Sequence, residues 1–266
     1  MRAEHDTECL TGDLTAAGRG RKPLKELVQR ARDPEWVADT ALRLVVRTWD
    51  LVSPSEFSSL YRRIRTRTMC SNARLRGLYR GVRDVLENEV PGDFVECGSA
   101  LGGSAALIAL TLRQLGVSRP LWLFDTFEGL PAPTLDDPDF EIANLFTGSC
   151  LGTLDEVQHL FEQLQVREQV QFIKGLFQET LPTAAVSQIA LLHIDGDWYG
   201  SVKACLDNLY DKVAPGGIIQ FDDYRYWKGA RKAIDEFLGA RGVRAPLKRL
   251  DYSGRFLVKP LSSNEP

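Results

Sequence analysis

The sequence predicts an α/β fold in which helices cover both faces of a mostly parallel sheet. Two observations predict it. From residue 92 onward, short apolar segments alternate with segments of helical period. Most of the short segments are apolar throughout, as strands buried on both faces are, instead of alternating between apolar and polar residues. With 266 residues, 44% of them hydrophobic, the chain can bury a sizeable core.

The first third of the chain is predicted to be an N-terminal helical extension. Residues 1–22 are polar and are expected to form a flexible N-terminus. Residues 23–90 have helical period and are expected to form a helical cap region, in which Pro34 separates two helices. Residues 91–260 then form the main domain.

The main domain is predicted to contain seven strands, because five short apolar segments precede a terminal antiparallel hairpin that turns at Ser253–Gly254. The five predicted strands are residues 92–98, 120–126, 170–175, 188–195 and 217–223, and the hairpin spans residues 247–259. The predicted helices between the strands are residues 104–116, 153–164, 201–213 and 229–242.

Acidic residues gather at the ends of the predicted strands. In parallel sheets, ligands bind outside the carboxyl ends of the strands, so residues that follow each strand are expected to face the site. These residues are Glu96, Cys97 and Gly98, Asp125 and Thr126, Gly175, Asp195, Gly196 and Asp197, and Asp222 and Asp223. Scattered surface acids would not concentrate at the same end of successive strands.

The segment "ECGSALGGS" (96–104) is predicted to be a turn that approaches a ligand. Its glycine spacing is that of neither a dinucleotide fingerprint nor a P-loop, and tight packing alone would also explain the glycines. Glu96 directly before the turn suits a cationic ligand, such as an ammonium or a sulfonium group. Asp125, at the end of the next strand, suits the hydroxyls of a ribose. The combination favours S-adenosylmethionine over NAD as the cofactor.

The paired aspartates predict a metal or catalytic site. Asp195 and Asp222 are separated by one helix and one strand, so they lie at neighbouring strand ends. Carboxylates that converge there repel one another, and a hard divalent cation such as Mg²⁺ relieves this repulsion. Aspartate also caps helices and forms turns, but that explanation fits a single aspartate better than two pairs at adjacent strand ends.

Five segments, taken together, resemble the macrocin O-methyltransferase (TylF) family. They are "GDFVECGSALGGSA", "FDTFEGLP", "FIKGLFQETLP", "LLHIDGDWYGSVKACLDNLYDKVAPGG" and "IIQFDDY". The resemblance covers about residues 60–259. It implies a Rossmann-like class I methyltransferase fold, with residues 91–260 as its S-adenosylmethionine-dependent domain. It also implies Mg²⁺-dependent methylation of a hydroxyl, expected to be a sugar hydroxyl, on a glycosylated natural product.

The resemblance also implies roles for individual residues. Asp195, Asp222 and Asp223 would bind the metal, and Asp195 would be the general base. Asp197 would support the site from behind. Residues at the cofactor would be Thr68, Met69, Glu96, Gly98, Ser99, Asp125 and Asp195, and Thr126 and Gly175 join them from their places at strand ends.

Several features have two interpretations on the sequence alone. Eight arginines between Arg62 and Arg83 form either a solvated helix face or a rim that attracts anions. His193, inside an apolar strand, is expected to be a hydrogen-bonded core or cofactor-contacting residue rather than a base. Tyr224, Tyr226 and Trp227 form either core or a wall for the acceptor. Residues 127–149 are long enough for a lid over the cofactor.

Composition and charge indicate which partners and which compartment to expect. The net charge of −3 gives no reason to expect nucleic acid or a membrane as partner. The five scattered cysteines indicate neither a zinc site nor a disulfide framework, and we expect a cytoplasmic protein. The expected partner is a small-molecule acceptor, and the family resemblance implies a homodimer or higher homo-oligomer. Two alternative functions remain open. The protein could methylate a phenolic or other non-sugar hydroxyl, or it could be a non-catalytic module that binds the cofactor.

Overall fold

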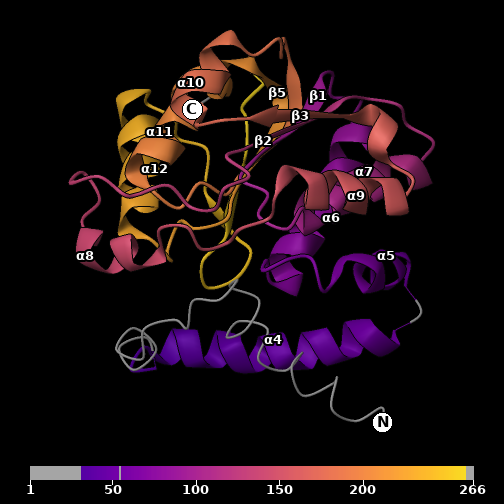
Figure 1. Cartoon of the computed structure of the whole chain (residues 1–266), viewed down its shortest axis with the longest axis horizontal. Helices are drawn as coiled ribbons and strands as arrows, with labels where there is room; N and C mark the ends of the chain where they lie inside the picture. Colours follow the sequence, from indigo (N-terminus) through magenta and orange to yellow (C-terminus); the bar gives the residue numbers. More distant parts are fainter. Residues whose placement is uncertain (1–30, 54, 262–266) are drawn as a thin grey trace.

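The computed structural model describes residues 31–53 and 55–261 and contains a seven-stranded sheet of order β3-β2-β1-β4-β5-β7-β6 (Figure 1). The first five strands are parallel, whereas β7 is antiparallel to β5 and β6 is antiparallel to β7. The predicted fold class is therefore confirmed. The strands are β1 (Asp93–Cys97), β2 (Leu121–Asp125), β3 (Val170–Lys174), β4 (Ile189–Ile194), β5 (Val213–Phe221), β6 (Lys248–Arg249) and β7 (Arg255–Val258).

The helices agree with the predicted order and differ at their ends. The helix predicted over residues 201–213 ends at Leu209, because Val213 already pairs with Ile189 and β5 begins there. The α-helices are α4 (Pro34–Val52), α5 (Glu56–Ile64), α6 (Asn72–Glu87), α7 (Gly103–Gln114), α8 (Phe140–Ala143), α9 (Leu154–Gln163), α10 (Phe177–Thr180), α11 (Tyr199–Leu209) and α12 (Lys228–Ala240). Short 3₁₀ turns are η1 (Asn144–Phe146), η2 (Arg167–Gln169), η3 (Leu181–Thr183) and η4 (Tyr210–Lys212).

Two hydrophobic clusters pack against opposite faces of the sheet. On one face, α5, α6, α7 and α9 surround β-strand residues such as Phe94 and Leu191. On the other face, α10, α11 and α12 pack on neighbours such as Val95 and Leu192. Because adjacent strand residues point to opposite faces, both faces of each central strand are dry, which is why these segments are apolar throughout.

The helices α5 and α6 of the N-terminal region pack directly against the main domain. α6 contacts β4 and β5, and the Gln220 side chain donates a hydrogen bond to the backbone carbonyl of Arg74 at 3.2 Å. Pro34 is the first residue of α4, whose N-cap is Asp33, so the expected interruption at Pro34 is a helix start. The expected flexible segment 1–22 lies outside the described residues. The division at residues 90 and 91 stays a prediction.

Candidate active site

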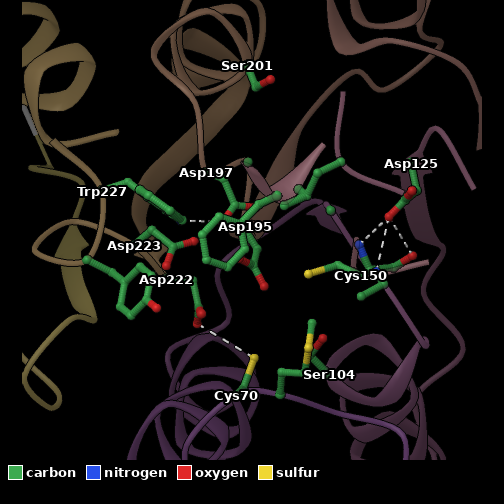
Figure 2. A pocket seen from close by; sticks show the side chains of 18 of the residues that line it. Cys70, Ser104, Asp125, Cys150, Asp195, Asp197, Ser201, Asp222, Asp223 and Trp227 are labelled. Carbon is green, nitrogen blue, oxygen red and sulfur yellow. Dashed lines mark hydrogen bonds between the residues drawn. The ribbon is translucent and has the colours of Figure 1, made fainter. Parts of the chain in front are cut away.

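One pocket opens at the carboxyl ends of β1, β2, β4 and β5. Figure 2 shows Asp125 on one side of it, Asp222, Asp223 and Trp227 on the other, and Asp195 between them. The predicted residues that line it are Thr68, Met69, Gly98, Ser99, Asp125, Thr126, Asp195, Asp222 and Asp223. Residues from the helical region and from the last hairpin therefore meet at the strand ends, although they are far apart in sequence.

The turn after β1 needs glycine because two strand ends approach each other there. Gly98 has φ +91°, and a Cβ on it would lie 1.9 Å from the carbonyl oxygen of Asp195. The backbone N–H of Asp195 donates to the carbonyl of Cys97 at 2.8 Å, so the two ends are also joined directly. The turn lets backbone groups face the pocket before α7 begins.

Asp125 holds this turn against the end of β2. Its Oδ2 accepts hydrogen bonds from the backbone N–H of Ser99 at 2.6 Å, from the Ser99 hydroxyl at 3.0 Å and from the backbone N–H of Ala100 at 3.2 Å. Its Oδ1 accepts from the backbone N–H of Phe127 at 2.7 Å. The carboxylate is therefore fixed at the edge of the pocket, in position for hydroxyl groups of a ligand.

Two predicted residues do not line the pocket. Glu96 is completely buried behind it, where its Oε1 accepts from the Ser104 hydroxyl and faces Nδ1 of His193 at 2.9 Å. Its side chain points into the sheet face that α7 covers, so the expected direct contact with a cationic ligand is not made. Gly175 also stays outside the lining, and the residues that follow it, Leu176 and Phe177, take that place.

His193 is buried between two carboxylates, those of Glu96 and Asp222. Burial alone would lower its pKa, but Asp222 and Glu96 on either side of the ring raise it to about 9. A protonated imidazole has no lone pair with which to accept a proton. This agrees with the expectation that His193 is a buried hydrogen-bonded residue rather than a base.

Four aspartates converge in the pocket. Asp195, Asp197 and Asp223 have carboxylate oxygens within 4.8 Å of one another. Burial, and then the neighbouring negative charges, raise the pKa of Asp195 and of Asp197 well above its usual range and that of Asp223 to about 6. The three acids therefore hold protons more strongly than exposed aspartates do, and a cation among them would relieve the repulsion.

Asp222 has a different environment from the other three acids. Burial would raise its pKa, but Arg74 and His193 outweigh that effect and hold it below its usual range. Arg74 pairs with Oδ2 of Asp222 and with Asp251 at 3.0 Å, and its side chain is buried. Arg74 lies neither on a solvated helix face nor on a rim that attracts anions. Its buried guanidinium offsets the negative charge of Asp222 and Asp251. No motif in the sequence marks this residue, because its partners lie more than 140 positions away.

The acidic cluster fits a hard divalent cation. Asp195, Asp197 and Asp223 form an all-oxygen donor set of the kind that Mg²⁺ prefers. Asp195 and Asp223 belong to the predicted metal triad, whereas its third member, Asp222, directs one oxygen to Arg74. Asp197 is held in position by Trp227, whose ring N–H donates to Asp197 Oδ1 at 2.7 Å. The ligand set stays a prediction, with Asp197 as a further donor that the sequence left unassigned.

The three aromatic residues after the second aspartate pair have different positions. Trp227 is buried and packs edge-on against Trp198 and Phe146, with ring centres 4.9 and 5.2 Å apart, and it also lines the pocket. Tyr226 lines the pocket next to it. Tyr224 donates its hydroxyl to Asp235 at 2.7 Å on α12 and does not line the pocket. Trp227 therefore serves both core packing and the pocket wall, and Tyr226 belongs to the wall.

The segment over the pocket, residues 127–149, is anchored along its length. The ring N–H of Trp198 donates to the carbonyl of Pro131 at 2.7 Å, and Asp137, which is buried, accepts from the backbone N–H of Tyr199 at 2.7 Å. Leu130, Pro131 and Phe146 line the pocket from this segment. It covers the site as expected, and its opening and closing stay a prediction.

The glycine-rich turn after β1 and the acid at the end of β2 make the sheet Rossmann-like, and a solved structure of similar fold and 34% identity is an O-methyltransferase. The sequence matches the family described as macrocin-O-methyltransferase (TylF) over residues 62–259. The chain belongs to this family, and it is an O-methyltransferase.

Two curated relatives are similar over most of their length. The chain is 34% identical to 8-demethyl-8-(2,3-dimethoxy-alpha-L-rhamnosyl)-tetracenomycin-C 4'-O-methyltransferase of Streptomyces olivaceus, over 71% of this chain and 74% of the relative. It is 36% identical to demethyldecarbamoylnovobiocin O-methyltransferase of Streptomyces niveus, over 70% and 73%. Among solved structures, the O-methyltransferase NovP superposes with a TM-score of 0.68 at 34% identity, over 73% of this chain and 82% of that one.

Replacing Gly98 should damage the cofactor half of the pocket. In Gly98→Ala, the new methyl group must displace the Asp195 backbone, which we expect to cost roughly 1–3 kcal/mol and to weaken S-adenosylhomocysteine binding at least about tenfold. Thermal unfolding and isothermal titration calorimetry measure the two effects. Gly239→Ala is the matched control, because a Cβ there meets nothing within 4 Å. Binding of the two variants with equal affinity would contradict the role of the turn.

Proposed function

We propose that the protein transfers a methyl group from S-adenosylmethionine to a sugar hydroxyl of a glycosylated natural product, with Mg²⁺ as metal cofactor. The observation that carries this proposal is the cluster of Asp195, Asp197 and Asp223, in one pocket with Asp125 and the glycine-rich turn. The relatives support the acceptor class, because their names refer to a rhamnosyl tetracenomycin and to a novobiocin precursor.

The cofactor half of the pocket is proposed to bind S-adenosylmethionine along the turn after β1. Asp125 would accept hydrogen bonds from the ribose hydroxyls, and Thr126 lies beside it. Gly98 and Ser99 would line the path to the methionine end, where Thr68 and Met69 approach from the segment before α6. Glu96 is proposed to contribute indirectly, through the pocket-lining hydroxyl of Ser104.

The acceptor half is proposed to align a hydroxyl for in-line attack. The acceptor oxygen attacks the methyl carbon, the bond from sulfur to methyl breaks, and the hydroxyl proton passes to Asp195. Burial raises the pKa of Asp195, so its ionised form is a stronger proton acceptor than an exposed aspartate. Mg²⁺, when bound, supplies positive charge that stabilises the developing alkoxide. Tyr226 and Trp227 form the wall against which a ring of the acceptor can pack.

Two alternative functions use the same pocket. A phenolic acceptor would fit the same aromatic wall, and a non-catalytic module would bind the cofactor without turnover. The sugar acceptor is preferred over the phenol because of the relatives. Catalysis is preferred because binding of the cofactor alone does not require three converging carboxylates. Assays of a glycosylated acceptor and its aglycone, side by side, distinguish these functions.

Neutralising Asp195 should abolish turnover and leave cofactor binding nearly unchanged. In Asp195→Asn, the proton acceptor is lost while the side-chain volume is retained, so kcat should fall by at least about 10²-fold. Steady-state kinetics and titration calorimetry with S-adenosylhomocysteine measure both quantities. Asp235→Asn, on the surface of α12, is the control. A fully active Asp195→Asn variant would remove Asp195 from the mechanism.

Magnesium should stabilise the protein more strongly as the pH rises. In the folded state the pKa of Asp223 is raised to about 6 and that of Asp195 is also raised, so protons compete with Mg²⁺ at low pH. Ionisation of Asp223 above about pH 6 leaves repulsion for the cation to relieve. Thermal unfolding with and without Mg²⁺ between pH 5 and 8 measures this increment, which EDTA should abolish. At a hundred times its Kd, Mg²⁺ should add about 2.7 kcal/mol. Asp223→Asn should lose the increment, and an equal increment at pH 5 would contradict the assignment.

We also propose that two copies associate through α4. Its outer face exposes large apolar side chains at helical spacing, whereas Asp50 on its inner face is buried against Asn72 and Arg76 of α6. Figure 1 shows α4 at the edge of the molecule, with one side directed away from the sheet. The exposed side chains are Val37, Leu42, Leu44, Val45, Trp49 and Val52. A two-fold axis would pair this face with itself and cover it.

Charge on the outer face of α4 should dissociate the oligomer. Val45→Glu combined with Trp49→Glu should shift the sedimentation coefficient from that of a dimer or larger oligomer to that of a monomer at micromolar concentration. Both side chains are about two-thirds exposed, at 67% and 66%, so the fold itself should tolerate the changes. Leu135→Glu, on the loop over the pocket, is the control for a new surface charge. An unchanged sedimentation coefficient in the double variant would reject α4 as the interface.

The cytoplasm is proposed as the compartment of the protein. Cys97 and Cys205 are buried neighbours that remain thiols, which supports a reducing environment. Among the described helices, none has the length and apolar character needed to cross a bilayer.

A further inference from the structure

A second group of possible metal donors lies below the carboxylate cluster. Cys70, His193, Asp195 and Asp222 bring one sulfur, one nitrogen and two carboxylate oxygens within 4.8 Å of one another. Figure 2 shows Cys70 and Asp222 facing each other at the lower edge of the pocket. Only Asp195 is shared with the all-oxygen set of Asp195, Asp197 and Asp223. The two groups differ in chemistry, because the lower one contains soft donors.

Two of the distances between these donors fit tetrahedral zinc. Cys70 Sγ lies 3.7 Å from Asp222 Oδ1, and His193 Nε2 lies 3.5 Å from the same oxygen. Zinc bonds of about 2.3 Å to sulfur and 2.0–2.1 Å to nitrogen or oxygen separate tetrahedral ligand atoms by roughly 3.3–3.7 Å. The distance between His193 and Asp222 is longer than an ordinary hydrogen bond, which leaves room for an ion to join the two atoms.

Both central donors are already oriented by other residues. Glu96 faces Nδ1 of His193 at 2.9 Å, which turns Nε2 toward the site. Arg74 pairs with Oδ2 of Asp222, which leaves Oδ1 for the donor group. Within the described part of the chain, Nε2 of the fully buried His193 makes no hydrogen bond. A carboxylate behind a ligating histidine is the usual outer support of a zinc site.

We propose that Cys70, His193, Asp195 and Asp222 form a binding site for Zn²⁺. On binding, the ion displaces the proton of the Cys70 thiol and any proton held by His193 or Asp195, and it forms bonds to the thiolate, the imidazole nitrogen and two carboxylates. Sulfur and nitrogen donors favour Zn²⁺ over Mg²⁺, which prefers oxygen. Because Asp195 belongs to both donor groups, Zn²⁺ in this site competes with Mg²⁺ for the carboxylate of Asp195. On the proposed function, it would therefore inhibit methyl transfer.

Cobalt substitution tests the site without an activity assay. The metal-free full chain is titrated with Co²⁺ and its absorption spectrum recorded, because a thiolate ligand gives a sulfur-to-cobalt charge-transfer band in the near ultraviolet. We expect this band in the wild type, its loss on addition of one equivalent of Zn²⁺, and its absence in Cys70→Ser. Cys150→Ser is the matched control, since Cys150 lines the same pocket outside the donor group. A wild-type spectrum without the band would overturn the proposal, whatever the variants do.

Competition with a chromogenic chelator measures the affinity for Zn²⁺. We expect Cys70→Ser to weaken Zn²⁺ at least about tenfold and Cys150→Ser to leave it unchanged. Equal weakening in both variants would reject Cys70 as a ligand. Protein that binds Zn²⁺ through Cys70 but methylates no acceptor at any Mg²⁺ concentration would support the zinc site and count against the proposed function alone.

Discussion

The convergence of five carboxylates at one sheet edge is the constraint on which the rest of the site depends. Glu96, Asp195, Asp197, Asp222 and Asp223 lie in or directly behind the pocket, and Arg74 and His193 supply the opposite charge from within. Two cations do not balance five carboxylates. Burial and mutual repulsion raise the pKa values of Asp195, Asp197 and Asp223, and a metal ion or a sulfonium would neutralise the charge that remains.

Arg74 makes the helical region part of the site. It lies in the first turn of α6, and its guanidinium joins Asp222 to Asp251 of the terminal hairpin. Asp251 in turn accepts from the backbone N–H groups of Ser253 and Gly254, at 2.9 and 2.6 Å, so the hairpin turn fixes the partner of the arginine. Three distant segments are therefore tied together by one buried network, which sets the floor of the pocket.

The pocket offers two kinds of cation environment within a few ångströms. The upper one has carboxylate oxygens only, and the lower one adds a thiol and an imidazole. Asp195 belongs to both, and it follows β4 directly, where Gly98 allows the closest approach of the neighbouring strand. Its position at the junction explains why the same residue is the proposed base, a proposed magnesium ligand and a proposed zinc ligand. Donor chemistry, rather than distance, separates the two environments.

The sheet, the glycine turn and the edge at which the site forms can be predicted from the sequence. Strand hydrophobicity and glycine placement are local properties, and the carboxyl ends of parallel strands always share one edge. Which side chains reach the pocket depends on the folded arrangement of the chain. Glu96 turns into the sheet face while Asp125 stays at the rim, and Arg74 and Cys70 meet Asp222 across about 150 positions of chain. Such contacts depend on side-chain direction and on the packing of α6 against β5. Neither can be predicted from the spacing of residues along the chain.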